Sequence, residues 1–148
     1  GRGLSLPAII AARAPPGLAI FRAERTMLIT RDPGTEPNAI LACSAGLVRL
    51  RDRDYLTSLI VTRTAVIDDW NPAAVEDLTI ADFADLLALS PEVVLLGTGA
   101  RQRMPPPALH AAFASRRIGL EVMDTGAACR TYSLLLSEFR EVAVALMI

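Results

Sequence analysis

The sequence predicts a single α/β domain in three layers, in which a mixed central sheet combines N-terminal antiparallel hairpin strands with a C-terminal parallel β-α-β-α-β unit. Short apolar and β-branched runs separated by turn residues occupy residues 39–70, a pattern typical of hairpins. After Pro91 apolar strands alternate with helical patterns, and strands joined by helices form right-handed parallel crossovers. The length of 148 residues suits one hydrophobic core.

Residues 1–26 are predicted to lie outside this domain, as a flexible extension or as sequence upstream of a native start at Met27. They include Pro15-Pro16-Gly17 and show no sustained period of a strand or a helix. Their Arg-rich, acid-poor composition is also that of transit peptides. The domain is therefore expected to span residues 27–148.

The antiparallel strands are predicted at AILAC, LVRL, YLTSLIV and AVIDDW, with turns at residues 44–46 and 52–54. Thr79 and Asp82 have the spacing of a capping box, which predicts a helix that ends at Ser90-Pro91. The apolar face of this helix is expected to hold Ile80, Phe83, Ala84 and Leu87.

The parallel unit begins with VVLLG at residues 93–97. Prolines 105–107 open a helix, LEVM at 120–123 is the second strand, and VAVALMI closes the chain as the third. The last helix begins near Gly126. Its buried face is expected to hold Ala128, Tyr132 and Leu135, and its opposite side Arg130, Ser133 and Ser137.

Composition excludes several classes of protein. With 52% hydrophobic and 21% charged residues the chain is not intrinsically disordered, and a net charge of -1 gives no general attraction to nucleic acid or anionic lipid. No apolar run approaches the roughly 18 residues that suggest a membrane span. Two cysteines without a secretory signal favour a reducing cytoplasm.

Several segments together resemble a known domain family. They are YLTSLIVT with the later Trp70, LLGTG at 95–99, MDT at 123–125, AACRTY at 127–132, and Glu138 with Arg140 before the last strand. The resemblance covers about residues 27–148. The family includes bacterial and archaeal proteins of unknown function, the adipogenesis-associated protein and mitochondrial complex I (NADH dehydrogenase) assembly factor 3.

The resemblance implies a three-layer α/β fold and a non-catalytic role in respiratory complex assembly, with no settled activity for bacterial members. Two residues depart from the family pattern: Ser133 stands where the family usually has Asn, and Phe139 where it usually has Gly. Phe139 argues against any role that needs a bare backbone at that position.

Two glycine-containing loops follow strands of the parallel unit. Gly97-Thr98-Gly99 lacks the third glycine of a dinucleotide-binding loop, because Gln102 stands there. Asp124-Thr125-Gly126 resembles the loop of aspartic proteases, but only one copy exists and it leads into a helix. Asp124 or Thr125 is instead expected to cap that helix.

A small anion-compatible pocket is predicted between these loops. Ligands of open α/β sheets favour the crevice at the carboxyl ends of parallel strands, and both loops lie at such ends if the two strands are neighbours. The lining is expected to come from Gly97, Thr98, Gly99, Arg101, Asp124, Thr125 and Arg130.

No complete catalytic set is visible. Cys129 lies in the first turn of a helix beside Arg130, which makes it the candidate reactive thiol, although a small buried thiol is the alternative that we favour. Cys43, His110 and Cys129 have no metal-ligand spacing, so neither a metal nor another cofactor is expected. Asp68-Asp69 is assigned to a solvated strand end.

Two classes of function follow. The first is a non-enzymatic interaction or assembly factor with a protein partner, which the resemblance and the missing catalytic set favour. The second is an anion-binding protein or enzyme that uses the crevice between the Gly97–Gly99 and Asp124–Gly126 loops. Glu138 and Arg140, two residues apart, do not face each other on a helix and are expected to orient the helix-to-strand junction through other partners.

Overall fold

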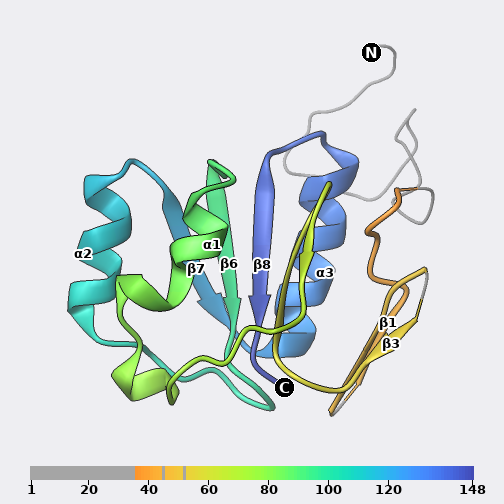
Figure 1. Cartoon of the computed structure of the whole chain (residues 1–148), viewed down its shortest axis with the longest axis horizontal. Coiled ribbons are helices and arrows are strands. Elements are labelled where there is room, and N and C mark those ends of the chain that lie inside the picture. Colours follow the sequence, from red (N-terminus) through yellow and green to blue (C-terminus); the bar gives the residue numbers. More distant parts are fainter. Residues whose placement is uncertain (1–35, 45, 52) are drawn as a thin grey trace. The chain divides into compact units, whose positions relative to one another are not determined.

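The computed structural model describes residues 36–44, 46–51 and 53–148 (Figure 1). All of them belong to one unit, Pro33–Ile148. The predicted extension over residues 1–26 and the predicted start of the domain at Met27 lie outside the described residues.

Two sheets contain the strands of the described residues. A three-stranded antiparallel sheet has the order β1-β2-β3, and a five-stranded sheet has the order β5-β4-β8-β6-β7. In the larger sheet β8, β6 and β7 are parallel, whereas β4 is antiparallel to both β8 and β5. The strands are β1 (Ala42–Ser44), β2 (Leu47–Arg49), β3 (Asp54–Tyr55), β4 (Leu59–Thr62), β5 (Val66–Ile67), β6 (Val93–Gly97), β7 (Gly119–Met123) and β8 (Val142–Leu146). The mixed central sheet with its parallel unit is thus confirmed.

The run YLTSLIV contributes one strand to each of the two sheets. Tyr55 ends β3, which pairs with β2, and Leu59 begins β4, which pairs with β8. Between them the chain leaves both sheets, and Leu56 is 68% exposed. The sequence pattern predicts one strand here. The structure has two, because the first part of the run pairs with β2 in one sheet and the second part pairs with β8 in the other.

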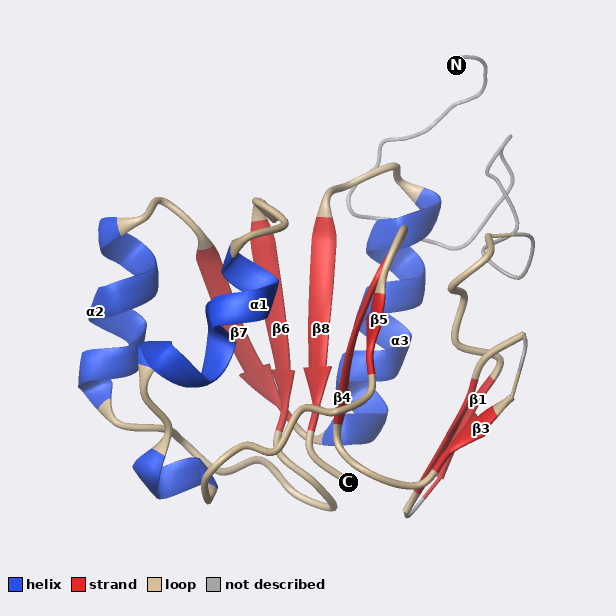
Figure 2. Ribbon diagram, viewed as in Figure 1, coloured by secondary structure: helices blue, strands red, loops and turns tan. Residues whose placement is uncertain are grey.

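The helices lie on both faces of the five-stranded sheet (Figure 2). They are α1 (Ala84–Leu87), α2 (Pro107–Ser115) and α3 (Thr125–Ser137), with 3-10 helices η3 (Val75–Asp77) and η4 (Ile80–Phe83) before α1. The capping box is present, since the Thr79 backbone N–H donates to Asp82 Oδ2 at 2.9 Å. No helix among the described residues has the length and apolar character needed to cross a membrane.

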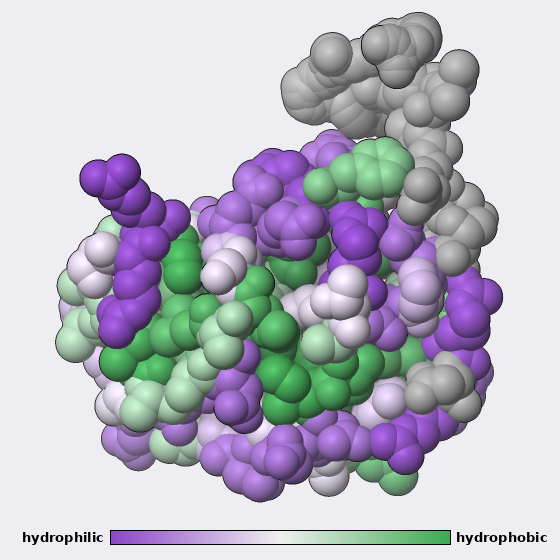
Figure 3. Space-filling model, turned by 45° about the horizontal axis from the view of Figure 1, so that its top comes forward, coloured by the Kyte–Doolittle hydropathy of each residue, from purple (hydrophilic) through white to green (hydrophobic). Residues whose placement is uncertain are grey.

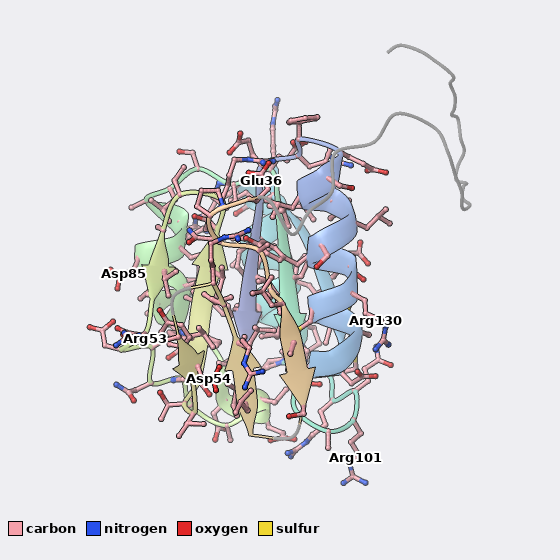
Figure 4. All side chains as sticks on the ribbon, turned by 90° about the vertical axis from the view of Figure 1, so that its right-hand side faces the viewer. Glu36, Arg53, Asp54, Asp85, Arg101 and Arg130 are labelled. Carbon is pink, nitrogen blue, oxygen red and sulfur yellow. The ribbon has the colours of Figure 1, made fainter. Side chains whose placement is uncertain are left out.

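Alternate residues of β8 face two different cores. Val142, Val144 and Leu146 join a cluster with α3 and the three-stranded sheet, whereas Ala143 and Ala145 join a cluster with α1 and α2. In the side view of Figure 4, α1 and α3 accordingly lie on opposite sides of the strands. β8 is buried on both faces, which explains its continuous apolar sequence.

The expected faces of the helices are largely confirmed. Phe83, Leu109 and Phe113 are fully buried, as are Ala128 and Tyr132 of α3. The expectation for Ala84 is wrong: it is exposed, and Leu86 is buried in its place. The reason is that η4 is a 3-10 helix, whose tighter turn shifts the buried face relative to a continuous α-helix.

Each loop that leads from a helix into a parallel strand contains a non-glycine residue in the left-handed region. These residues are Ser90, Arg117 and Phe139, with φ of 52°, 59° and 61°. After α3, the Arg140 N–H donates to the Leu135 carbonyl, as in a Schellman motif. Glycine adopts this conformation without steric cost, which accounts for the glycine that the family usually has where Phe139 stands.

Replacement of Arg117 by glycine is expected to stabilise the protein by about 1 kcal/mol, because the exposed side chain sits at the left-handed position of the motif that ends α2. Denaturant unfolding of the wild type and the variant measures the difference. Arg117→Ala is the control, since it removes the same side chain but keeps a Cβ. Equal stability of the glycine and alanine variants would contradict the explanation.

Candidate functional site

The two predicted loops meet because β6 and β7 are adjacent parallel strands. The Thr98 N–H donates to the Met123 carbonyl, and the Thr125 N–H donates to the Gly99 carbonyl, each at 2.9 Å. In return the Gly99 N–H donates to Thr125 Oγ1 at 2.8 Å. The loops are therefore joined directly, backbone to backbone and backbone to side chain.

Thr125 also ties these loops to the end of the chain. Its hydroxyl donates to the Met147 carbonyl at 2.8 Å, and the Met147 N–H donates to the Gly97 carbonyl at 2.9 Å. The side chain is buried, with 8% exposure. One hydroxyl thus links the carboxyl ends of β6, β7 and β8.

Thr98 organises its own loop. Its hydroxyl donates to the Arg101 carbonyl at 2.8 Å and lies 3.2 Å from the Met123 carbonyl, while it accepts from the Arg103 N–H at 3.0 Å. The residue is 5% exposed. Both threonine hydroxyls therefore use their hydrogen-bonding capacity within the protein.

The two glycines of the first loop serve different needs. A Cβ at Gly97 would lie 2.9 Å from Thr125 Cα and 3.1 Å from Ala128 Cβ, so the space beside Gly97 is filled by the first turn of α3. Gly99 has φ of 99°, a conformation that L side chains rarely adopt. Close backbone approach is thus present at Gly97, and the approaching group is helix α3.

Asp124 is the N-cap of α3. Thr125, the other residue predicted as a cap, uses its hydroxyl for the hydrogen bonds to Gly99 and Met147 instead. Asp124 Oδ1 accepts from the Ala127 N–H at 2.8 Å. This satisfies one of the free N–H groups of the first turn and places a negative charge at the positive end of the helix dipole.

Asp124→Ala is expected to lower the free energy of unfolding by about 1 kcal/mol, because the first turn of α3 loses its cap. Asp124→Asn is the matched control: its amide oxygen still accepts the Ala127 N–H, so most of the stability should return. Thermal unfolding of both variants measures this. Two variants of equally low stability would argue that the charge, rather than the cap, matters.

The two arginines predicted to line the pocket lie at the surface. Arg101 extends from the loop after β6, and Arg130 extends from α3 (Figure 4). Arg130 Nη1 lies 3.4 Å from the position that a Cβ at Gly126 would take, next to Asp124 Oδ1. The structure therefore brings Gly97, Thr98, Gly99 and Thr125 together, with Asp124 and Arg130 at the start of α3 beside them.

The candidate thiol Cys129 is buried, with 5% exposure. Burial raises the pKa of the Cys129 thiol, and hydrogen bonding with Cys43 raises it further. His110 lies in α2, which packs on the opposite face of the sheet from α3. Among the described residues no three His, Cys, Asp or Glu side chains gather as metal ligands would.

Asp68 and Arg140, two of the residues that the sequence analysis considered, take part in ion pairs at the surface. Asp68 Oδ2 accepts from Arg53 Nη2 at 2.6 Å. Arg140 reaches Glu92 with its Nε at 3.2 Å, and the Glu141 N–H donates to the same carboxylate. This arrangement holds the junction between α3 and β8, as expected for Arg140. Partial burial raises the pKa of the Glu138 carboxyl.

A buried polar cluster escaped the sequence analysis. Glu36 is 4% exposed and pairs with Arg63 Nη1 at 3.0 Å, and Arg63 Nη2 also donates to the Leu136 carbonyl. Tyr132 donates its hydroxyl to the Asn38 carbonyl at 2.9 Å, and burial raises the pKa of Tyr132. The partners are far apart in sequence and share no motif, so no local pattern indicates this cluster.

The fold and the joined loops define a mixed α/β domain in which hydrogen bonds connect two glycine-containing loops at the ends of parallel strands. Within this class, the chain belongs to the family described as "Protein of unknown function (DUF498/DUF598)", whose model matches residues 40–147. The family that the sequence motifs indicate is thereby confirmed.

Two relatives illustrate the similarity to known proteins. The chain is 36% identical over 130 residues to the Bos taurus NADH dehydrogenase (ubiquinone) 1 alpha subcomplex assembly factor 3, with 86% of this chain and 70% of the bovine protein covered. It is 30% identical over 91 residues to a "13 kDa major membrane protein" of Francisella tularensis, with 61% and 74% covered.

A solved structure supports the fold. The NMR structure of a Xanthomonas campestris protein is 34% identical and superposes with a TM-score of 0.70, covering 82% of this chain and 92% of that one. The similarity thus extends over nearly the whole of the Xanthomonas protein.

Proposed function

We propose that this protein is a non-enzymatic, assembly-factor-like protein that binds a protein partner during the biogenesis of respiratory complex I. The observation that carries the proposal is the similarity to the bovine assembly factor over 86% of this chain. The proposal includes a bacterial source, which the Xanthomonas neighbour supports, and a cytoplasmic location, which the two free cysteines favour.

The chemistry of the loops supports a non-enzymatic role. A nucleophile or general base needs a group that is available to a substrate. Here the Thr98 and Thr125 hydroxyls are hydrogen-bonded to backbone groups, and burial raises the pKa of the Cys129 thiol, which keeps it protonated at neutral pH. The two hydroxyls act as structural elements of the fold, and the protonated Cys129 thiol is a poor nucleophile at neutral pH.

The surface supports a role in binding protein. Figure 3 shows a continuous apolar area on one face, bordered by hydrophilic residues. Contiguous apolar patches with polar rims are typical of protein interaction sites. An assembly factor needs such a surface, because it holds a partner by burying apolar area.

Deletion of the gene in its native host tests the proposal. The amount of assembled complex I is measured by native gel electrophoresis with an in-gel NADH dehydrogenase stain. We expect a loss of assembled complex that the wild-type gene restores. An unchanged amount of complex I in the deletion strain would overturn the proposal.

The anion-binding alternative makes a different prediction. Phosphate, sulfate and nucleotides are titrated at millimolar concentrations into the wild type and into Arg130→Ala, which leaves the hydrogen bonds of the threonines in place. We expect no binding by either protein. Binding to the wild type that Arg130→Ala removes would favour the crevice as a ligand site.

A further inference from the structure

The two cysteines of the chain lie in the same apolar region of the fold, although 85 residues separate them in sequence. Cys43 is in β1 of the three-stranded sheet, and Cys129 is in the first half of α3. Cys43 packs on the apolar cluster that contains Cys129, and it is close enough to raise the pKa of the Cys129 thiol. The pair therefore lies where the three-stranded sheet meets α3.

We propose that Cys43 and Cys129 are a redox-active pair, which forms a reversible disulfide by exchange with a low-molecular-weight disulfide such as oxidised glutathione. The difference in exposure assigns the roles. Cys43 is only partly buried, so it is the thiol that the external disulfide reaches, whereas Cys129 is 5% exposed and reacts second.

The exchange proceeds in two balanced steps. The Cys43 thiolate attacks one sulfur of the external disulfide; a mixed disulfide forms and one small thiolate leaves. The Cys129 thiolate then attacks Cys43 Sγ, which releases the second small thiolate and leaves the Cys43–Cys129 bond. Two protein thiols are oxidised, the external disulfide is reduced to two thiols, and a reducing thiol pool reverses both steps.

Burial of Cys129 limits the rate of the second step. The raised pKa of the Cys129 thiol makes its thiolate rare at neutral pH, and exchange needs the thiolate. The conversion of mixed disulfide to protein disulfide should therefore accelerate as the pH rises from 7 to 9. The first step depends on Cys43 alone.

The disulfide would change how the three-stranded sheet is attached to the rest of the domain. Oxidation would link β1 covalently to α3, in addition to the chain connection through residues 56–58. A cross-link that closes so long a loop restricts the unfolded chain strongly. The oxidised protein is accordingly expected to unfold at a higher temperature than the reduced protein.

Mass spectrometry of the intact chain tests the proposal. Reduced wild type, Cys43→Ser and Cys129→Ser are incubated with oxidised glutathione and then alkylated, after circular dichroism has verified that each variant is folded. We expect the wild type to lose two hydrogens and to retain no glutathione. Cys129→Ser should stop at a glutathione adduct on Cys43, and Cys43→Ser should react at least tenfold more slowly.

Four outcomes would overturn the proposal. The first is a wild type that stops at the glutathione adduct even at pH 9. The second is a Cys43→Ser variant that reacts as fast as the wild type, and the third is a disulfide between two chains, which a non-reducing gel detects. Unaltered wild-type thiols after incubation at pH 9 would count equally against it.

Discussion

Gly97→Ala is expected to lower the free energy of unfolding by about 3 kcal/mol, the upper end of the usual cost of overpacking. The added Cβ would lie 2.9 Å from Thr125 Cα, 3.0 Å from Thr125 Oγ1 and 3.1 Å from Ala128 Cβ. Backbone atoms cannot rotate away as the end of a side chain can, so α3 must move from β6. Denaturant unfolding monitored by circular dichroism measures the loss.

Gly119→Ala is the matched control, because Gly119 begins the neighbouring strand β7. A Cβ there would meet no atom closer than Val93 Cγ2 at 3.6 Å, an ordinary contact distance. Its stability should equal or slightly exceed that of the wild type, since alanine has less backbone freedom to lose. A Gly97→Ala protein as stable as Gly119→Ala would show that α3 does not approach β6 so closely.

Thr125→Val is expected to cost about 2–3 kcal/mol, because valine keeps the shape of threonine but not its hydroxyl. The Gly99 N–H and the Met147 carbonyl both lose their hydrogen-bond partner. Each is only partly accessible to water, which would otherwise replace the partner. Thermal unfolding measures the cost, and amide hydrogen exchange at Gly99 should accelerate.

Thr125→Ser separates the hydroxyl from the methyl group. Serine retains both hydrogen bonds and loses one buried methyl, so its cost should be about 0.8 kcal/mol. The valine variant should therefore be less stable than the serine variant. The reverse order would mean that Thr125 acts mainly through apolar packing.

The predictions for Gly97 and Thr125 concern the same contact between α3 and the parallel strands. Gly97 allows α3 to approach the sheet, and Thr125, which fills the space beside Gly97, joins the ends of three parallel strands. A glycine in a strand often marks a bulge, a bend, or the close approach of a ligand or of another backbone. In this protein the neighbour is the helix, which is why similar motifs in sequence do not by themselves indicate a ligand site.

The family motifs lie at this contact between α3 and the sheet and in the loop that follows α3. LLGTG and MDT provide the joined loops, AACRTY provides the buried face of α3, and Arg140 follows the left-handed residue at which α3 ends. Phe139 preserves the backbone conformation that glycine adopts freely. The resemblance is thus a resemblance of structural positions.

The sequence by itself determined the features that depend on neighbours along the chain. The parallel unit follows from alternating apolar strands and helices, and the capping box of Thr79 and Asp82 follows from their spacing. The start of α3 was predicted with Asp124 or Thr125 as its cap, and Asp124 is the cap in the structure. Pro107 begins α2, as proline does at the first turn of a helix. Each of these signals acts over a few residues, within reach of local hydrogen bonding and steric restriction.

Only the tertiary structure decided which distant residues meet. It divided YLTSLIV between two sheets and paired Glu36 with Arg63. It placed Cys43 against the apolar cluster that contains Cys129, and it engaged the Thr125 hydroxyl with Gly99 and Met147. The physical reason is that these contacts depend on how β-strands pair and how α3 packs. Burial, and hydrogen bonds between residues far apart in the sequence, determine the chemistry of the candidate site; the local sequence pattern does not.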